Sequence, residues 1–283
     1  MRHFQYIIIT VYLLISLFRC QPANSLTDKL RVTVSILPLT EFIREIGGEK
    51  VTVDVMIPPG AFPHSYEPKP AQLRQLKNTD VFVKVGTPVE FEVNWMDKLI
   101  QINPHMQIID ASPGIDLIGS EDHIDPHIWL SPKNAKIMVQ SITRGLILAD
   151  SVNSHFYQNN QENYLDKLDQ LDNQISALFA HKTKSDFIVL HPSWSYFTRD
   201  YGLNQIGIEH EGKEPSARHL QLLIDEANQK EIAVVFIAPQ DNPKNAFTLA
   251  NEISANIQTI DPLDGNYIAN LTHVAQLVSE TLK

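Results

Sequence analysis

Short runs of β-branched residues alternate with longer segments of helical periodicity along this chain, and this alternation limits the possible folds more than any other feature. Strands that alternate with helices in sequence form a parallel sheet that the helices cover. Two such sets are present, one in each half of the chain. The expected strands are residues 32–37, 51–56, 81–85 and 107–110, then 187–190, 205–208, 233–237 and 257–260. Helices are expected at about 41–46, 70–77, 91–102, 216–230, 244–254 and 267–282.

The stretch between the two sets predicts a long connecting helix. Apolar residues recur at helical spacing from about Asn153 to Ala180, and this span contains no proline. We therefore expect an α/β protein with two lobes, each a parallel sheet of about four strands with flanking helices, joined by one long helix. The expected boundaries are 26–150 for the N-terminal lobe, 151–182 for the linking helix and 183–283 for the C-terminal lobe.

The first 23 residues have the proportions of an export signal. An apolar run over residues 4–18 follows a positively charged start, and it is shorter than the roughly 20 residues that span a bilayer. Cys20 stands just past the end of this run, as in a bacterial lipoprotein signal, although Phe18 and Arg19 stand where small residues are usual. We expect an exported protein, on the outer face of the cytoplasmic membrane or in the periplasm. It is either lipid-anchored at Cys20 or cleaved near Ala23 and freely soluble.

The charge balance limits the partners of the chain. Lys and Arg number 23 against 33 Asp and Glu, a net charge of −10, which disfavours binding to the phosphate backbone of nucleic acids. The single cysteine excludes an intramolecular disulfide and a paired-cysteine metal knuckle. The 11 histidines remain as candidate metal ligands, because imidazole is the commonest metal-binding side chain in proteins.

Four candidate ligands stand beside predicted strand ends or on proline-bracketed loops. In open parallel sheets, ligands bind beyond the carboxyl ends of the strands. His64 lies on a proline-stiffened loop after the second strand, and His127 lies on another loop bracketed by prolines. His191 and Asp261 directly follow predicted strands of the second set. Three imidazoles and one carboxylate complete a tetrahedral site for a borderline cation such as Zn²⁺.

Five segments of the chain match a known family. They are residues 58–68 (from Pro58-Pro59-Gly60 to Pro63-His64-Ser65-Tyr66-Glu67-Pro68), 125–132 (Asp-Pro-His-Ile-Trp-Leu-Ser-Pro), 190–197 (Leu-His-Pro-Ser-Trp-Ser-Tyr-Phe), 214–216 and 261–263. On these segments the chain resembles the solute-binding proteins of zinc and manganese ABC importers, the zinc-binding lipoprotein and adhesin-like family. The resemblance covers about Val32 to Leu282. It implies two α/β lobes joined by one long helix, with a metal ion between them and ligands at His64, His127, His191 and Asp261.

The resemblance also implies the transported ion and the partners. In the family the third ligand position is histidine in zinc importers and often glutamate in manganese importers, so His191 favours Zn²⁺, with Mn²⁺ as the alternative. A non-enzymatic carrier of this kind, expected to be a monomer, delivers the metal to an ABC permease that is driven by a separate ATPase subunit. Membrane contact then comes through the permease or through the lipid anchor.

Two features near the expected site have more than one interpretation. Many zinc members of the family carry a long histidine-rich loop before the Asp-Pro-His segment, and here it is reduced to residues 120–124. His123 in that loop is either a remaining zinc contact or a solvated residue. Glu209, Glu211 and Glu214 either accept hydrogen bonds from the ligand histidines or serve as solvated and helix-entry residues.

Three other functions remain open on the sequence. A manganese or iron solute-binding protein of the same family is one. An exported zinc-dependent hydrolase is another: it would hold zinc with three histidines and a water. It also requires a positioned general base, and the sequence has no HExxH motif. A surface adhesin is the third, because relatives have been called adhesins.

Overall fold

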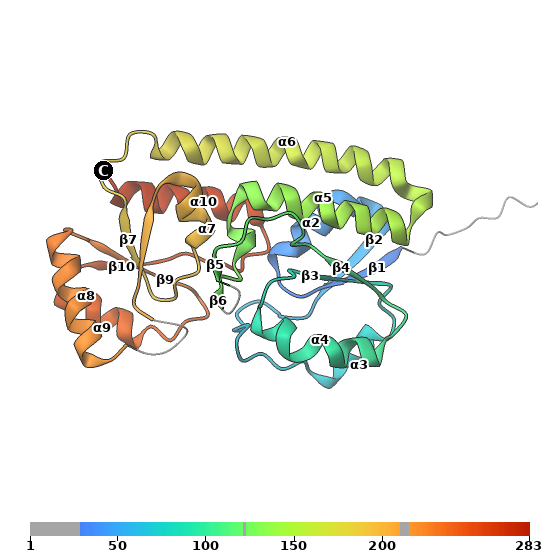
Figure 1. The fold of residues 1–283 in the computed structure, drawn as a ribbon, viewed down its shortest axis with the longest axis horizontal. Helices are drawn as coiled ribbons and strands as arrows, with labels where there is room; N and C mark the ends of the chain where they lie inside the picture. Colours follow the sequence, from blue (N-terminus) through green and yellow to red (C-terminus); the bar gives the residue numbers. More distant parts are fainter. Residues whose placement is uncertain (1–28, 121–122, 210–214) are drawn as a thin grey trace, which may run out of the picture.

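The computed structural model describes residues 29–120, 123–209 and 215–283, which form two four-stranded parallel sheets in two lobes (Figure 1). The first sheet has the order β2-β1-β3-β4 and the second β10-β9-β7-β8. The strands are β1 (Leu30–Val34), β2 (Val51–Val55), β3 (Val81–Lys84), β4 (Gln107–Asp110), β7 (Asp186–Val189), β8 (Asn204–Gly207), β9 (Val234–Ile237) and β10 (Asn256–Thr259). Counted from the first strand of each sheet, both orders are 2-1-3-4. The expected α/β fold is confirmed.

Prolines and serines set where several helices begin. Pro38, Pro70 and Pro132 occupy the first helical turn, where the missing N–H costs no hydrogen bond. Ser131 caps the helix that begins at Pro132, and Ser216 caps a further helix start; each accepts the backbone N–H three residues on. The helices are α2 (Pro38–Gly47), α3 (Pro70–Leu76), α4 (Glu90–Ile102), α5 (Pro132–Ala149), α6 (Ser154–Phe179), α7 (Ser195–Tyr201), α8 (Ala217–Gln229), α9 (Lys244–Glu252) and α10 (Tyr267–Thr281).

The structure departs from the sequence expectations at short elements. β1 ends at Val34 instead of residue 37, because α2 begins at Pro38 and the chain must leave the sheet before it. Helix α7 was not expected: its seven residues are too few to show a helical period, and Gly202 ends it with a φ of 61°. The two-residue strands β5 (Gly119–Ser120) and β6 (His123–Ile124) pair in an antiparallel hairpin that was also unexpected.

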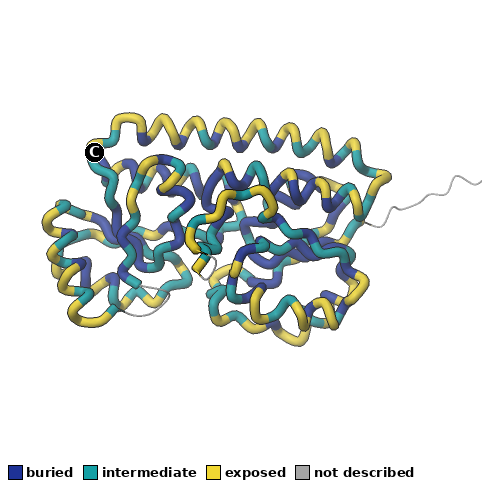
Figure 2. Tube along the Cα trace, viewed as in Figure 1, coloured by how far each residue is buried: buried dark blue, intermediate teal, exposed yellow. Residues whose placement is uncertain are grey.

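The expected long helix is α6, which runs along one side of both lobes (Figure 1). It packs against α5 and α2 of the N-terminal lobe and against α10 of the C-terminal lobe. One stripe of the helix is buried and the opposite side is exposed (Figure 2). Glu41 links α2, α6 and α10. Its Oε1 accepts hydrogen bonds from Tyr164 Oη of α6 at 2.8 Å and from the backbone N of Ile268 of α10 at 3.3 Å. The lobes are therefore joined along a helical layer.

Two hydrophobic cores support this arrangement. The larger core is continuous across both lobes and includes Phe42, Tyr164, Trp194 and Phe236. The smaller core lies between the second sheet and helices α8 and α9. β7 contributes to both cores, because alternate side chains of a strand point to opposite faces of the sheet.

The N-terminal segment with the expected export signal and Cys20 lies outside the described residues. In the part of the chain that is described, no helix is long and apolar enough to cross a membrane. The linking segment expected at 151–182 contains a short 3₁₀ turn (Ser151–Asn153) followed by α6. The domain boundaries remain a prediction.

Candidate metal centre

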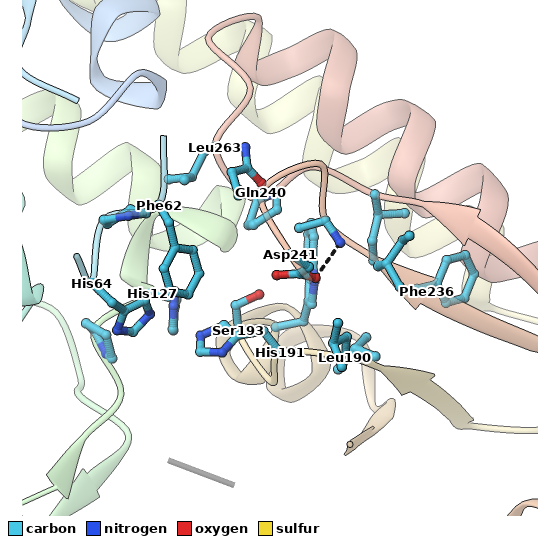
Figure 3. A pocket seen from close by; sticks show the side chains of 18 of the residues that line it. Phe62, His64, His127, Leu190, His191, Ser193, Phe236, Gln240, Asp241 and Leu263 are labelled. Atoms are coloured by element: carbon cyan, nitrogen blue, oxygen red, sulfur yellow. Dashed lines mark hydrogen bonds between the residues drawn. The ribbon is translucent and has the colours of Figure 1, made fainter. Parts of the chain in front are cut away.

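A pocket lies between the two lobes, beyond the carboxyl ends of the central strands. His64, His127 and His191 line it together with apolar side chains from both lobes (Figure 3). The volume of the cavity within which a water molecule can be centred is about 40 Å³. One water molecule needs roughly 10–15 Å³ of such volume, so the pocket has room for a metal ion and a few waters.

His64 lies on the loop between β2 and α3 and is held by Glu90, the first residue of α4. Its Nδ1 lies 2.7 Å from Glu90 Oε1, and its ring packs on Phe62 with the ring centroids 4.6 Å apart. Burial by itself would raise the pKa of Glu90, but the hydrogen bond from His64 and the charge of that ring outweigh it and lower this pKa. Glu90 is therefore an ionised acceptor for the Nδ1–H of His64.

His127 immediately precedes a 3₁₀ turn (Ile128–Leu130) and is held by Asp125. Oδ1 of Asp125 accepts hydrogen bonds from the backbone N of His127 at 2.9 Å and from its Nδ1 at 2.8 Å. Burial would raise the pKa of Asp125, but the hydrogen bond and charge of His127 outweigh it and lower this pKa. Burial lowers the pKa of His127 in spite of Asp125. The ring is thus kept in the neutral form that binds metals.

His191 follows β7 after one intervening residue, Leu190. Its Nδ1 lies 3.3 Å from Glu209 Oε2. Its Nε2 is buried and has no hydrogen-bond partner among the residues that the structure describes. A buried polar atom without a partner destabilises a fold by about 1–3 kcal/mol. A metal ion in the pocket would supply the partner that this nitrogen lacks.

The three histidines share one arrangement, in which Nδ1 of each ring faces a carboxylate. A carboxylate only accepts, so Nδ1 carries the proton and Nε2 presents its lone pair, as in carboxylate–histidine–zinc triads. The ring centroid of His191 lies 5.0 Å from that of His64 and 5.4 Å from that of His127. Two imidazoles on one tetrahedral zinc, with Zn–N bonds of about 2.0–2.1 Å, have their centroids about 5 Å apart. The ring spacing therefore suits a shared zinc ion.

The donor atoms have not converged on one point. In the described residues, no three histidine, cysteine, aspartate or glutamate side chains are arranged so that they could hold a metal ion as they stand. The ring of His191 meets the other two nearly edge-on, at interplanar angles of 74° and 71°. Metal binding therefore requires the imidazole rings to rotate. Because the rings already have the spacing of zinc ligands, they need to move only a short distance.

Asp261, the fourth expected ligand, turns its carboxylate to other partners. Its Oδ1 accepts hydrogen bonds from the backbone N of Leu263 at 2.8 Å and from Gln240 Nε2 at 3.0 Å. Burial raises the pKa of Asp261 in spite of these two bonds. Asp261 is not among the described residues that line the pocket. The structure thus brings together three of the four expected ligands and leaves Asp261 beside them.

Asp241 lines the pocket and was not expected from the sequence. Its Oδ2 accepts a hydrogen bond from the backbone N of Ala238 at 2.7 Å (Figure 3). Burial raises the pKa of Asp241, although that bond and the charge of His191 oppose the effect. The rule that selected His191 and Asp261 also points here, because Ala238-Pro239-Gln240-Asp241 directly follows β9. The sequence therefore carries a signal for Asp241 as well.

The structure bears differently on the two features that had more than one interpretation, the three glutamates and His123. Glu209 contacts His191, as in the first of its two interpretations. Glu211 and Glu214 lie outside the described residues. His123 is exposed on β6 and does not belong to the set of described residues that line the pocket.

Comparison with known proteins adds an independent line of evidence. The profile of the family "Zinc-uptake complex component A periplasmic" matches residues 32–281. The chain is 33% identical over 260 residues to the high-affinity zinc uptake system protein ZnuA of Bacillus subtilis (strain 168), covering 86% of this chain and 81% of that protein. It is 26% identical over 238 residues to the manganese-binding lipoprotein MntA of Halalkalibacterium halodurans, covering 81% of this chain and 78% of that protein.

A solved structure, described as the crystal structure of ZnuA, shares the fold with a TM-score of 0.88 and 39% identity, covering 90% of this chain and all of that one. The sequence match and the likeness of structure both extend through the two lobes that form the pocket. The chain belongs to the family of the periplasmic zinc-uptake component A, the ZnuA family.

Proposed function

We propose that this protein captures Zn²⁺ outside the cytoplasm, between its two lobes, and delivers the ion to an ABC-type membrane permease. One observation carries the proposal. Three histidines from both lobes meet in a small pocket with each Nδ1 facing a carboxylate, and the Nε2 of His191 is buried without a partner in the described structure. This arrangement presents imidazole lone pairs to a cation.

The donor set favours zinc over manganese. Neutral imidazole suits Zn²⁺ well, whereas Mn²⁺ prefers carboxylate, carbonyl and water oxygens and stands lowest in the affinity order of divalent metals. His64, His127 and His191 are nitrogen donors. The 33% identical relative is named as a zinc-uptake protein, and the relative named for manganese is 26% identical. We therefore assign Zn²⁺ as the main cargo and Mn²⁺ as a weaker one.

Asp261 completes the site in this proposal. Its side chain reaches the cation only after it leaves its present bonds to Gln240 and Leu263. Three histidines therefore bind first, and the carboxylate closes the fourth position. The final site has the three-imidazole, one-carboxylate set of a closed tetrahedral zinc centre.

Carrier function fits the pocket better than hydrolysis. Members of the ZnuA family are substrate-binding components of transporters and not enzymes. The cavity has room for an ion with a few waters. A fourth protein ligand at Asp261 would occupy the position at which a catalytic zinc activates water.

Delivery requires other proteins. The family works with the permease and the ATPase of an ABC importer, and its members are exported lipoproteins or periplasmic binding proteins. For this chain we propose export by the N-terminal signal, action as a monomer, and contact with the membrane through the permease or through a lipid on Cys20.

Metal titration of the purified protein tests the proposal. The metal-free protein is titrated with Zn²⁺ and with Mn²⁺ in competition with a chelator, beside a variant that carries His64→Ala, His127→Ala and His191→Ala together. We expect one zinc ion per chain, weaker manganese binding, and no tight site in the triple variant. Zinc binding that survives in the triple variant would refute the assignment of the site.

A further inference from the structure

Gln240 stands between the pocket and Asp261. It lies on the loop after β9, and Asp261 lies on the loop after β10, the neighbouring strand of the same sheet. The carboxamide lines the pocket (Figure 3), and its Nε2 donates to Asp261 Oδ1 at 3.0 Å. The side chain that binds Asp261 thus belongs to the pocket wall, whereas Asp261 itself does not appear in that wall as described.

The amide group of Gln240 is satisfied on one side only. A carboxylate accepts hydrogen bonds and cannot donate them, so the NH₂ group must face Asp261. This orientation leaves Oε1 of Gln240 buried, with no hydrogen-bond partner among the described residues. The contact with Asp261 therefore holds the amide in an orientation that leaves its oxygen without a hydrogen bond, which is energetically unfavourable.

The backbone around Asp261 is fixed by other contacts. Its carbonyl oxygen accepts a hydrogen bond from Asn270 Nδ2 at 2.6 Å. The carbonyl of the next residue, Pro262, accepts one from Trp129 Nε1 of the N-terminal lobe at 2.8 Å. With the main chain held by these contacts, rotation of the side chain is the movement left to the carboxylate. Such a rotation breaks the bonds that Oδ1 accepts from Gln240 and from the backbone N of Leu263.

We propose that Gln240 is a latch for Asp261. In the metal-free protein it holds the carboxylate away from the three histidines, and on metal binding Asp261 exchanges the amide N–H for the metal ion. Gln240 is thus a positioning residue that weakens the closed site and eases release of the ion. This inference rests on the proposed function and on Asp261 as the fourth ligand.

Replacement of Gln240 by methionine tests the latch. Gln240→Met keeps the length of the side chain and removes the hydrogen bond. We expect zinc affinity to rise about three- to tenfold, the equivalent of one net hydrogen bond, and zinc transfer to a chelator to slow by a similar factor. Gln258→Met is the matched control, because Gln258 on β10 also has a buried Oε1 without a partner in the described structure. The control should leave both quantities unchanged.

A second background separates the latch from a general packing effect. In Asp261→Ala, the substitution Gln240→Met should leave zinc affinity unchanged, because there is no carboxylate to hold. A loss of affinity in Gln240→Met, or an equal change in both backgrounds, would overturn the latch. A parent protein that binds no zinc would instead refute the proposed function.

The side-chain amide of Gln240 gives a readout that does not depend on affinity. Its ¹H–¹⁵N NMR signals are identified by their absence from Gln240→Met. On addition of Zn²⁺ we expect these signals to shift and their exchange with solvent to speed up, because the bond to Asp261 is lost. Signals that stay unchanged in the zinc-loaded protein would show that the latch does not open.

Discussion

The two sheets have the same strand order, but the crevice between their first and third strands is filled differently. In the N-terminal lobe, the carboxylate of Glu92 folds back and accepts hydrogen bonds from the backbone N of Val85 at 2.7 Å and of Gly86 at 3.0 Å. Glu92 is 4% exposed, so its carboxylate is buried at that strand end. In the C-terminal lobe, Asp241 accepts a hydrogen bond from the equivalent strand end, and His191 stands beside an open pocket. The same strand order thus places a buried carboxylate at the crevice of one sheet and a pocket-lining carboxylate at the crevice of the other.

The lobes also differ in how they present their histidines. His191 comes two residues after the end of β7, and its side chain is 13% exposed. His64 stands on a loop between β2 and α3, and its side chain is 25% exposed. A ligand on a strand end is fixed by the sheet, whereas a ligand on a loop can move with the loop. The comparison indicates that the His191 strand end supplies a fixed half of the site and the His64 loop a mobile half, with His127 as buried as His191 at 13% exposed.

The largest expected effect is on the fixed half. His191→Ala should lower zinc affinity by more than about 100-fold, because loss of a ligand exceeds the 10–100-fold cost of losing a ligand's supporting partner. By the same argument His127→Ala should cost more than the loss of its partner Asp125, and His64→Ala, on the loop, should cost at least about tenfold. Competition with a chelator measures the affinities, and circular dichroism of the metal-free variants checks the fold. His105→Ala, at an exposed site, is the control. Parental affinity in any of the three ligand variants would remove that histidine from the site.

The buried carboxylate of Glu92 should contribute to the stability of the fold and not to zinc affinity. Glu92→Ala leaves two backbone N–H groups without their acceptor, so the free energy of unfolding should fall by about 2–3 kcal/mol. Asp241→Ala removes one such bond at a more open position and should cost less than about 1.5 kcal/mol. Urea unfolding of the two metal-free variants measures both. Equal losses of stability would mean that the two crevices do not differ in this way.

Loss of the carboxylates that accept hydrogen bonds from the histidines should lower zinc affinity by an intermediate amount. Asp125→Ala frees the ring of His127 and should lower zinc affinity by about 10–100-fold. Asp125→Asn should restore part of the loss, because its carbonyl oxygen can still accept from Nδ1. Glu209→Ala should cost less than Asp125→Ala, since its contact with His191 is longer, at 3.3 Å against 2.8 Å. The reverse order would contradict the supporting role assigned to these carboxylates.

Acid should weaken zinc binding. Histidine binds metal as the neutral imidazole, and its ordinary pKa is about 6.5. Affinity should therefore fall steeply between about pH 7 and pH 5. Burial lowers the pKa of His127, so this ring stays neutral to lower pH than an ordinary imidazole, and fewer than three protons should be released on binding at pH 6. Calorimetric titration in buffers of different ionisation enthalpy counts the protons. A flat affinity over this range would exclude a histidine site.

The smallest expected effect is on overall shape. Helix α6 packs on both lobes and contains no proline, and a helix without a proline or comparable break resists bending. The radius of gyration from solution scattering should be nearly the same with and without zinc. Hydrogen exchange should slow most in the His64 loop and around His127. A large compaction on loading would show that the lobes close about α6.

The sequence predicted most of the elements that position the site, because buried strands and amphipathic helices repeat their apolar pattern over many residues. The strand-end rule and the proline-bracketed loops pointed to His64, His127 and His191, which line one pocket in the structure; their role as metal ligands stays a prediction. The orientation of the Asp261 carboxylate was beyond that rule, because it depends on a rotamer and on Gln240, a residue from a different strand loop. The partner of His64 is Glu90, 26 residues away along the chain, and no local spacing relates the two.

The division of β7 between two cores has a consequence for local unfolding. Phe187 and Val189 belong to the core that both lobes share, whereas Ile188 and Leu190 belong to the small core beneath α8 and α9. Cooperative units of a protein can open separately when few apolar contacts join them. The α8–α9 layer can therefore open as a sub-global unit while the inner face of β7 stays packed. Amide protons of β7 are accordingly expected to exchange only with global unfolding. Those of α8 and α9 should exchange through a local opening of lower free energy. Bound zinc should raise the free energy of this local opening only a little.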